Sequence, residues 1–231
     1  MQKIPIRQLG RSQEIHPSAE RFKIRRIEDI VGDRDLVHGL HRHNFFFILA
    51  VRNGEGTHEI DFTSHTVRDN SLFFLRPGQV HQLYLKAGSS GYLAEFNTEF
   101  YNPKEPLSNQ RLKRASSKNF CGLDETRFAK LDTILASIFN EYTLREDAYE
   151  EMIRSSLKIF CIAYTRQGSN YTENRVATGT YAQDRFEDFL GLREKHIATH
   201  KQVSEYVDLM NLVALSAWPD AVSHSMVGPW R

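Results

Sequence analysis

Hydrophobic and polar residues follow short, strand-like patterns through most of the first 100 residues. Phe22 and Ile24 alternate with basic residues, which predicts a strand with one solvent-exposed face. Phe45 to Val51 form a continuous apolar run that is short enough for a buried strand. Further predicted strands cover Thr57–Phe62, Ser71–Leu75, Val80–Leu85 and Tyr92–Phe96.

Turn signals separate these segments. Asn53-Gly54 is a strong hairpin signal, because both residues tolerate a positive φ. Thr63-Ser64, Pro77-Gly78 and the segment Ala87–Gly91 mark further turns. Roughly eight short strands at intervals of about 8–12 residues predict a β-sandwich or a β-barrel.

The period changes to that of helices after residue 100. A polar loop comes first. Apolar residues then recur at helical spacing from Phe128 to Tyr142, and Asp124 is a suitable N-cap just before them. A second amphipathic stretch runs from Tyr149 to Tyr164 after a short link, so we expect the two helices to be antiparallel neighbours. Two further helices are predicted over about Tyr181–Ile197 and from Gln202.

These patterns predict an α+β chain, with an N-terminal β-barrel of the jelly-roll type followed by helices. The expected segments are a flexible arm over residues 1–19, a barrel over 20–100, a connecting loop and helix pair over 101–166, a linker over 167–180, a partial helical domain over 181–212 and an aberrant tail over 213–231.

The composition indicates the class of protein and its expected location. Hydrophobic residues make up 40% and charged residues 26% of the 231 residues, which is ordinary for a soluble globular protein. The net charge of +1 argues against an extended basic surface. No apolar run approaches the roughly 20 residues of a membrane helix. With only Cys121 and Cys161 and no secretory leader in view, we expect no disulfide framework, no membrane and a cytoplasmic location.

Two histidine motifs flank the predicted barrel strands. One is His41-Arg-His43, and the other is Pro77-Gly78-x-x-His81. Residues two apart in a strand point to the same face, so His41 and His43 project together. His81 meets them if the sheet closes on itself. This is the pattern of a small jelly-roll pocket lined by three imidazoles.

The whole layout resembles the AraC-type transcription regulators. It combines a half-buried barrel with both histidine motifs, an antiparallel helix pair, a polar linker and a helical segment, in that order. Lys201 to Leu212, with Val203-Ser-Glu-Tyr-Val-Asp within it, is similar to the first helix-turn-helix of that family, which often opens Val-Ser-x-Tyr-Ala-Asp-x-Leu-Asn. The resemblance covers about residues 20–212.

The resemblance implies a cupin-like barrel that binds a small-molecule effector. We expect its pocket to use imidazoles for hydrogen bonding, aromatic side chains for apolar walls and an arginine as a polar handle. A structural role remains the favoured interpretation for His58 and His65. The candidate effector-binding residues are His41, His43, Phe45, Phe47, His58, Arg76, His81 and Tyr84.

An alternative is a metal-dependent cupin enzyme, such as a dioxygenase or isomerase, that uses His41, His43 and His81. Three imidazoles can hold Zn²⁺ or Fe²⁺ with an open position. A metal-binding cupin normally adds a glutamate four or five residues after the second histidine, whereas Phe47 and Ile48 stand there. We therefore expect no resident metal or cofactor and no enzyme activity, and we keep the enzyme as the alternative.

The resemblance also implies a homodimer built by the helix pair. A surplus apolar stripe on these helices suits an isologous interface, in which the same patch of each subunit meets its copy. The candidate dimerisation residues are Phe128, Leu131, Leu135, Ile138, Tyr142, Met152, Ile153, Leu157 and Phe160.

Promoter DNA is the family's other partner, read by two helix-turn-helix units in adjacent major grooves. The residual candidates for DNA contact here are Gln202, Ser204, Tyr206 and Asn211. After Leu212 the sequence departs from the family: Pro219 would break the recognition helix, and Arg231 is the only cation to bind phosphate. We expect impaired DNA binding, and a frameshift near codon 212 is one hypothesis for the tail.

Overall fold

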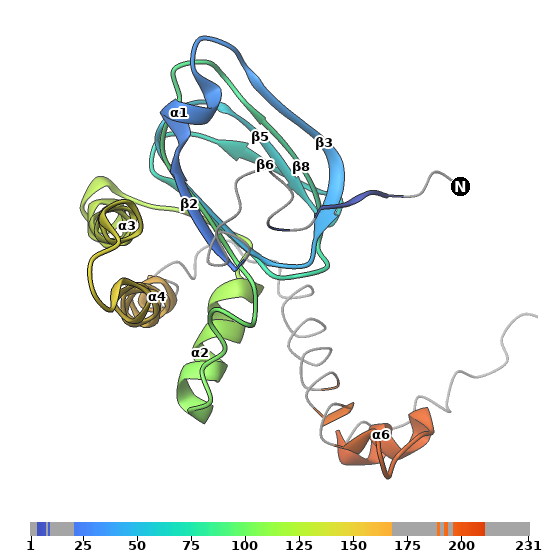
Figure 1. Ribbon diagram of the computed structural model, residues 1–231. Helices are drawn as coiled ribbons and strands as arrows, with labels where there is room; N and C mark the ends of the chain where they lie inside the picture. Colours follow the sequence, from blue (N-terminus) through green and yellow to red (C-terminus); the bar gives the residue numbers. More distant parts are fainter. Residues whose placement is uncertain are drawn as a thin grey trace, which may run out of the picture. The chain divides into compact units, whose positions relative to one another are not determined.

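Two five-stranded β-sheets pack against each other in the first part of the computed structural model (Figure 1). Sheet A has the strand order β1-β3-β8-β5-β6, and sheet B has the order β10-β7-β4-β9-β2. Sheet A comprises β1 (Ile6–Arg7), β3 (Leu36–His43), β5 (Gly56–Ile60), β6 (Thr63–Val67) and β8 (Val80–Leu85). Sheet B comprises β2 (Phe22–Arg26), β4 (Phe46–Asn53), β7 (Ser71–Leu75), β9 (Ser90–Phe96) and β10 (Phe120–Gly122).

The structure describes residues 4–7, 9, 21–167, 189, 192–193 and 196–210. The chain divides into two compact units, residues 1–172 and 173–231. Most of the predicted arm (1–19) and linker (167–180), much of the third predicted helix (181–197) and the whole tail (213–231) lie outside the described residues. Within the described part, no helix is both long and apolar enough to cross a membrane.

Sheet B is buried on both faces. Along β4, Phe47, Leu49 and Val51 face sheet A, whereas Ile48 and Ala50 face the helices. A strand that is covered on both sides needs no polar alternation, which explains the continuous apolar run in the sequence. Sheet A instead has one wet face, so its strands keep the period of two.

Three helices cover the outer face of sheet B. These are α2 (Pro106–Ser117), α3 (Glu125–Leu144) and α4 (Tyr149–Arg166), while the short α1 (Ile27–Val31) follows β2 (Figure 1). Asp124 caps α3 as expected, because its side chain accepts a 2.9 Å hydrogen bond from the backbone N–H of Arg127. The link between α3 and α4 is short, and the two helices pack directly on each other.

The α+β class is confirmed, but the sheets form an open jelly-roll-like sandwich rather than a closed barrel. The hairpin predicted at Asn53-Gly54 is wrong, because β4 and β5 belong to different sheets and this turn crosses between them. The tight hairpin joins β5 to β6 through Asp61 and Phe62, both with positive φ (47° and 66°). A phenylalanine in that conformation gives no turn signal in the sequence.

The polar loop predicted before the helix pair is partly helical and partly extended. Residues 106–117 form α2, with Pro106 in its first turn, where a proline has no backbone hydrogen bond to lose. Leu112 and Ala115 are its buried apolar residues, and the rest of its buried face is serine. A face built from small side chains has too weak a hydrophobic period to be recognised in the sequence.

Candidate functional site

Four histidines gather on the inner face of sheet A. His41 and His43 end β3, His58 lies in β5, and His81 lies near the start of β8. The strand register places His81 opposite His41 on one side and Ile60 on the other. All four side chains are buried, with 6% of His43 and at most 1% of the other three exposed. The structure thus brings together the two histidine motifs and adds His58 to them.

The imidazole rings touch one another in a chain of nitrogen contacts. His41 Nδ1 lies 2.6 Å from the Gly39 carbonyl oxygen, and His41 Nε2 lies 2.7 Å from His43 Nε2. His43 Nε2 is also 2.9 Å from His81 Nε2. His81 Nδ1 then lies 2.8 Å from His58 Nε2. One ligand nitrogen from each of His41, His43 and His81 lies within 4.8 Å of the others, a grouping suited to a single metal ion.

Aromatic rings wall this histidine cluster. Phe45 lies 4.2 Å from the ring of His43 between centroids, and Phe47 lies 5.2–5.3 Å from His43 and His81. Phe73 lies 4.6 Å from the ring of His58. Apolar walls exclude water, so the cluster sits in a low-dielectric interior where charge is costly.

Burial keeps these imidazoles neutral. It lowers the pKa of His43 to about 3 and the pKa of His58 to about 3, and nearby histidines lower both further. Burial also lowers the pKa of His41 and of His81 below the ordinary histidine value. Neutral imidazole is the form that binds metals and that both donates and accepts hydrogen bonds.

Charged side chains border the cluster at one edge of sheet B. Lys23 and Glu95 are register partners on the same face as Phe47, the face toward sheet A. Arg25 donates to Glu95 over 3.2 Å, and burial raises the pKa of this carboxyl while Arg25 opposes the shift. The alternation in β2 predicted a solvent-exposed face for Lys23 and Arg25, whereas the structure turns this face toward sheet A and leaves both residues only partly exposed.

His38 is a further member of this region that the sequence did not single out. Burial lowers its pKa to about 4, and the positive charges of Arg7 and Arg25 add to this shift. Its ring centroid lies 5.9 Å from that of His41. His38 precedes His41 by three residues, an odd spacing that does not share a face in a regular strand, but an irregular register between these residues brings the two rings together.

Two of the expected pocket residues lie elsewhere. Tyr84 follows Leu83 on β8, so it points to the outer face of sheet A, where its hydroxyl donates to Asp35 over 2.7 Å. Arg76 lies in the turn after β7, where its backbone N–H donates to Gln79 Oε1 over 2.9 Å. Period-two alternation separates Tyr84 from His81 in the same strand.

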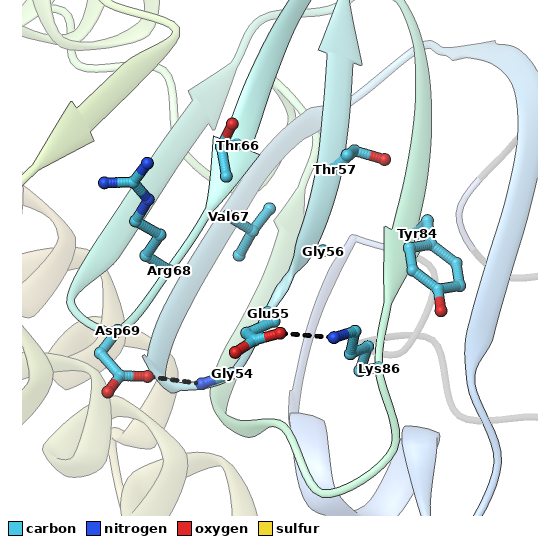
Figure 2. A pocket seen from close by; sticks show the side chains of 10 residues that line it. All are labelled: Gly54, Glu55, Gly56, Thr57, Thr66, Val67, Arg68, Asp69, Tyr84 and Lys86. Atoms are coloured by element: carbon cyan, nitrogen blue, oxygen red, sulfur yellow. Dashed lines mark hydrogen bonds and ion pairs between the residues drawn. The ribbon is translucent and has the colours of Figure 1, made fainter.

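Tyr84 lines a different, open pocket of about 590 Å³ at the edge of the β5–β6 hairpin and β8 (Figure 2). Glu55 and Lys86 form an ion pair across it, and Asp69 accepts a 2.8 Å hydrogen bond from the backbone N–H of Gly54. These partners tie the rim of the pocket together. Arg68 also lines this open pocket, whereas the histidine cluster is buried and gathers its polar groups at one point, which makes the cluster the stronger candidate site.

The helix-pair residues expected at a dimer interface lie mostly inside the protomer. Seven of them are at most 2% exposed and pack between the helices and sheet B: Phe128, Leu131, Leu135, Ile138, Ile153, Leu157 and Phe160. Tyr142 is half-buried against Phe22. Met152 is exposed and shares the outer face of α4 with Ile159, and Leu144 at the end of α3 is also exposed.

In the second unit, α6 (Val203–Leu209) carries the residual candidates for DNA contact. The Gln202 side chain accepts from the N3 backbone and Glu205 caps the helix start, so both groups stabilise its N-terminus. Tyr206 is buried and donates to the His200 carbonyl oxygen over 2.9 Å. Ser204 is exposed, and Asn211 lies outside the described residues.

The fold and site define a jelly-roll-like domain with a cluster of four buried histidines between its sheets. Residues 30–102 match the family model of the AraC-like ligand binding domain. This stretch contains all four clustered histidines. Over these residues the chain is similar to AraC-like ligand-binding domains.

Solved structures with a similar arrangement include three of particular interest. The AraC-like transcriptional activator CuxR is 11% identical over 74% of this chain and 58% of that chain, with a TM-score of 0.42. ToxT from Vibrio cholerae is 11% identical over 85% of this chain and 73% of that chain, with a TM-score of 0.38. A cupin protein from Bacteroides fragilis is 15% identical over 42% and 86%, with a TM-score of 0.24.

This chain thus spans less than two thirds of the CuxR chain. A search of curated proteins found no match to the sequence.

Proposed function

We propose that this chain is a ligand-responsive transcription regulator of the AraC type, whose jelly-roll domain binds a small effector. The observation that carries the proposal is the match of residues 30–102 to the AraC-like ligand binding domain. The physical support is a buried cluster of four neutral imidazoles with aromatic walls, in which His58 Nδ1 has no hydrogen-bond partner within the described part of the chain. We also place the regulator in the cytoplasm, together with the promoter that it controls.

The effector site of this proposal lies at the histidine cluster. His41, His43, His58 and His81 supply hydrogen-bonding groups, and Phe45 and Phe47 supply the apolar walls. Because the rings already contact one another, the body of an effector would lie beside the cluster rather than within it. Lys23 and Arg25 border the cluster, are partly exposed and carry positive charge, so they favour an effector with an anionic group. Tyr84 and Arg76 are left out of this site.

A promoter reporter tests the regulatory proposal. The reporter carries the upstream region of the gene, and the full chain is supplied or withheld while small acids, sugars and aromatic compounds are added. We expect at least one compound to change transcription only when the chain is present. The same compound should raise the Tm of the purified chain, because a ligand that binds only the folded state stabilises it. If the chain binds compounds but never alters transcription, the regulatory role is refuted and only ligand binding is supported.

Dimerisation belongs to the same proposal, with the outer faces of α3 and α4 as the interface. Met152 and Ile159 are seven residues apart on α4, so they lie on one face, and both are about half exposed (49% and 56%). Light scattering on the purified chain measures the mass. The M152K/I159K variant should shift a dimer to a monomer, whereas Y84F, on the far sheet, should leave the mass unchanged.

We propose promoter DNA as the partner of the second unit, with α6 in a supporting position. Its sequence Val203–Leu209 holds no lysine or arginine, and its tyrosine is buried, so it offers phosphate no cation. Fluorescence anisotropy with promoter DNA at low and physiological salt is the direct measurement. Binding that is weak and loses all sequence preference at physiological salt agrees with impaired DNA binding, and tight selective binding overturns it.

A second candidate function is a metal-dependent cupin enzyme, and the convergence of His41, His43 and His81 favours it. Among the described residues, the metal-type grouping contains these three histidines and no carboxylate. Turnover of a small-molecule substrate by the metal-loaded chain would establish the enzyme. Transcriptional control without turnover would establish the regulator.

A further inference from the structure

The contacts of His41 fix the position of its proton. His41 Nδ1 lies 2.6 Å from the Gly39 carbonyl oxygen, and a carbonyl oxygen can only accept. A neutral His41 therefore carries its hydrogen on Nδ1. Its Nε2 then presents a bare lone pair to His43 Nε2, 2.7 Å away.

His43 Nε2 contacts two other nitrogen atoms, although its single hydrogen or lone pair in the ring plane can serve only one of them. His41 Nε2 is 2.7 Å away and His81 Nε2 is 2.9 Å away. A neutral ring nitrogen carries either one hydrogen or one lone pair. If His43 donates to His41, the same hydrogen must be shared with His81. If His43 instead accepts from His81, two lone pairs face each other across the His41–His43 contact.

The contacts of His58 limit the remaining proton positions on His81. Its Nε2 lies 2.8 Å from His81 Nδ1, and its Nδ1 is buried without a hydrogen-bond partner in the described part of the chain. If His81 Nδ1 donates to His58, His81 Nε2 is bare and also points at His43. If His58 donates instead, His81 carries its hydrogen on Nε2 and recreates the lone-pair conflict at His41. No arrangement of neutral rings gives each contact a proton of its own.

A cation at the centre of the three Nε2 atoms removes the conflict. We propose that His41, His43 and His81 bind one divalent transition-metal ion through their Nε2 atoms, while Gly39 and His58 orient two of the rings. The Gly39 carbonyl accepts from His41 Nδ1, and His58 Nε2 accepts from His81 Nδ1. Metal-bound histidines commonly donate their other ring N–H to a carbonyl or a similar acceptor in this way.

The distances suit such an ion after a small adjustment. Metal–nitrogen bonds of about 2.0–2.1 Å in a tetrahedron place the nitrogens about 3.3 Å apart. The two contacts of 2.7 and 2.9 Å must open by about half an ångström, and all three ligand atoms already lie within 4.8 Å of one another. Three imidazoles and no carboxylate favour zinc, iron, nickel or copper over magnesium or calcium.

Three protein ligands leave a coordination position open. An effector with a carboxylate or hydroxyl oxygen binds to the ion at that position. This statement about the effector rests on the proposed function. The ion site itself rests only on the histidine geometry. The ion site and the binding of an effector to the ion can therefore be refuted independently.

Cobalt(II) is the probe, because its visible absorption reports a low-coordinate nitrogen site. The full chain, without a histidine tag, is freed of metal with EDTA and titrated with Co²⁺ alone. We expect one Co²⁺ per chain, a visible band, and displacement of that band by Zn²⁺. His43→Phe and His41→Asn should each abolish the band, and His58→Phe should weaken binding by about 10–100-fold through the lost orienting partner.

His196→Gln is the matched control, because His196 and His200 are four residues apart and could bind a metal without the cluster. It should keep the band. Circular dichroism shows which variants are folded, and His41→Asn decides if His43→Phe does not fold. The proposal is overturned if the unaltered chain gives no band, or if folded His41→Asn keeps it. If the chain binds cobalt but no compound changes transcription, the regulatory function is refuted and the ion site is still supported.

Discussion

Lowering the pH from about 7 to about 5.5 should destabilise the jelly-roll domain. His43 and His58 have folded-state pKa values of about 3, so they stay neutral in the folded chain across this range. In the unfolded chain their pKa returns to about 6.5, and they take up protons below that value. The unfolded state then binds more protons, so stability is fully present above about pH 6.5 and falls as the pH drops toward about 3.

The magnitude follows from the same values. A histidine that is protonated only when unfolded costs about 1.3 kcal/mol between about pH 7 and about pH 5.5. His43 and His58 together should therefore lower the free energy of unfolding by about 2.5 kcal/mol. His41 and His81, whose pKa values burial also lowers, act in the same direction. Glu95 acts in the opposite direction, because burial raises its pKa and the folded state holds its proton more tightly.

Urea unfolding followed by the β-sheet signal in circular dichroism, with EDTA present, gives the free energy at each pH. The H43F variant should lose about 1.3 kcal/mol of the pH dependence, corresponding to one histidine. The matched control H196Q, in the second unit, should keep the dependence of the sheet transition. Equal stability at both values, or greater stability at the lower one, would refute the claim that these imidazoles are neutral and buried.

Three further substitutions test the packing that supports the site. Gly56→Ala should cost about 3 kcal/mol in urea unfolding, because its Cβ would lie 2.0 Å from the backbone oxygen of Tyr84 and force β5 away from β8; a near-neutral result would contradict this strand pairing. Tyr164→Phe should cost about 1–3 kcal/mol, because it leaves the partly buried Lys118 carbonyl without its 2.7 Å donor, and a stabilised variant would show that this bond is not formed. Asp124→Ala should lower stability by about 1 kcal/mol through the lost α3 cap, whereas Asp124→Asn should keep most of it.

The sequence predicted the histidine pair because the spacing rule for strands is geometric. His41 and His43 lie two apart in one strand, so any sheet that buries one buries the other. It did not predict that β3 ends at His43 and that the apolar run beginning at Phe45 belongs to the other sheet. The corner at Asn44 carries no glycine or proline, so the chain changes sheets without a sequence signal.

The roles of His58 and of the polar face of β2 depend on three-dimensional context. A period of two says that the two faces of a strand differ, but it does not say that the polar face meets water. Lys23 and Arg25 lie on the face of β2 toward sheet A and are only partly exposed. His58 looked structural in isolation, yet β5 pairs with β8 and so places it against His81. Strand order of this kind is set by long-range pairing that no local pattern encodes.

The histidine cluster links occupancy of the site to stability of the fold. Neutral, crowded imidazoles are costly to bury, and the unfolded chain has no means of assembling three of them around one point. An occupant therefore binds the folded state alone and stabilises it by about 2.7 kcal/mol when present at 100 times its Kd. That gain is similar in size to the loss expected between about pH 7 and about pH 5.5. A bound ion or effector should thus offset the acid sensitivity of the domain, and the difference between curves with and without EDTA separates the ion's share from the effector's.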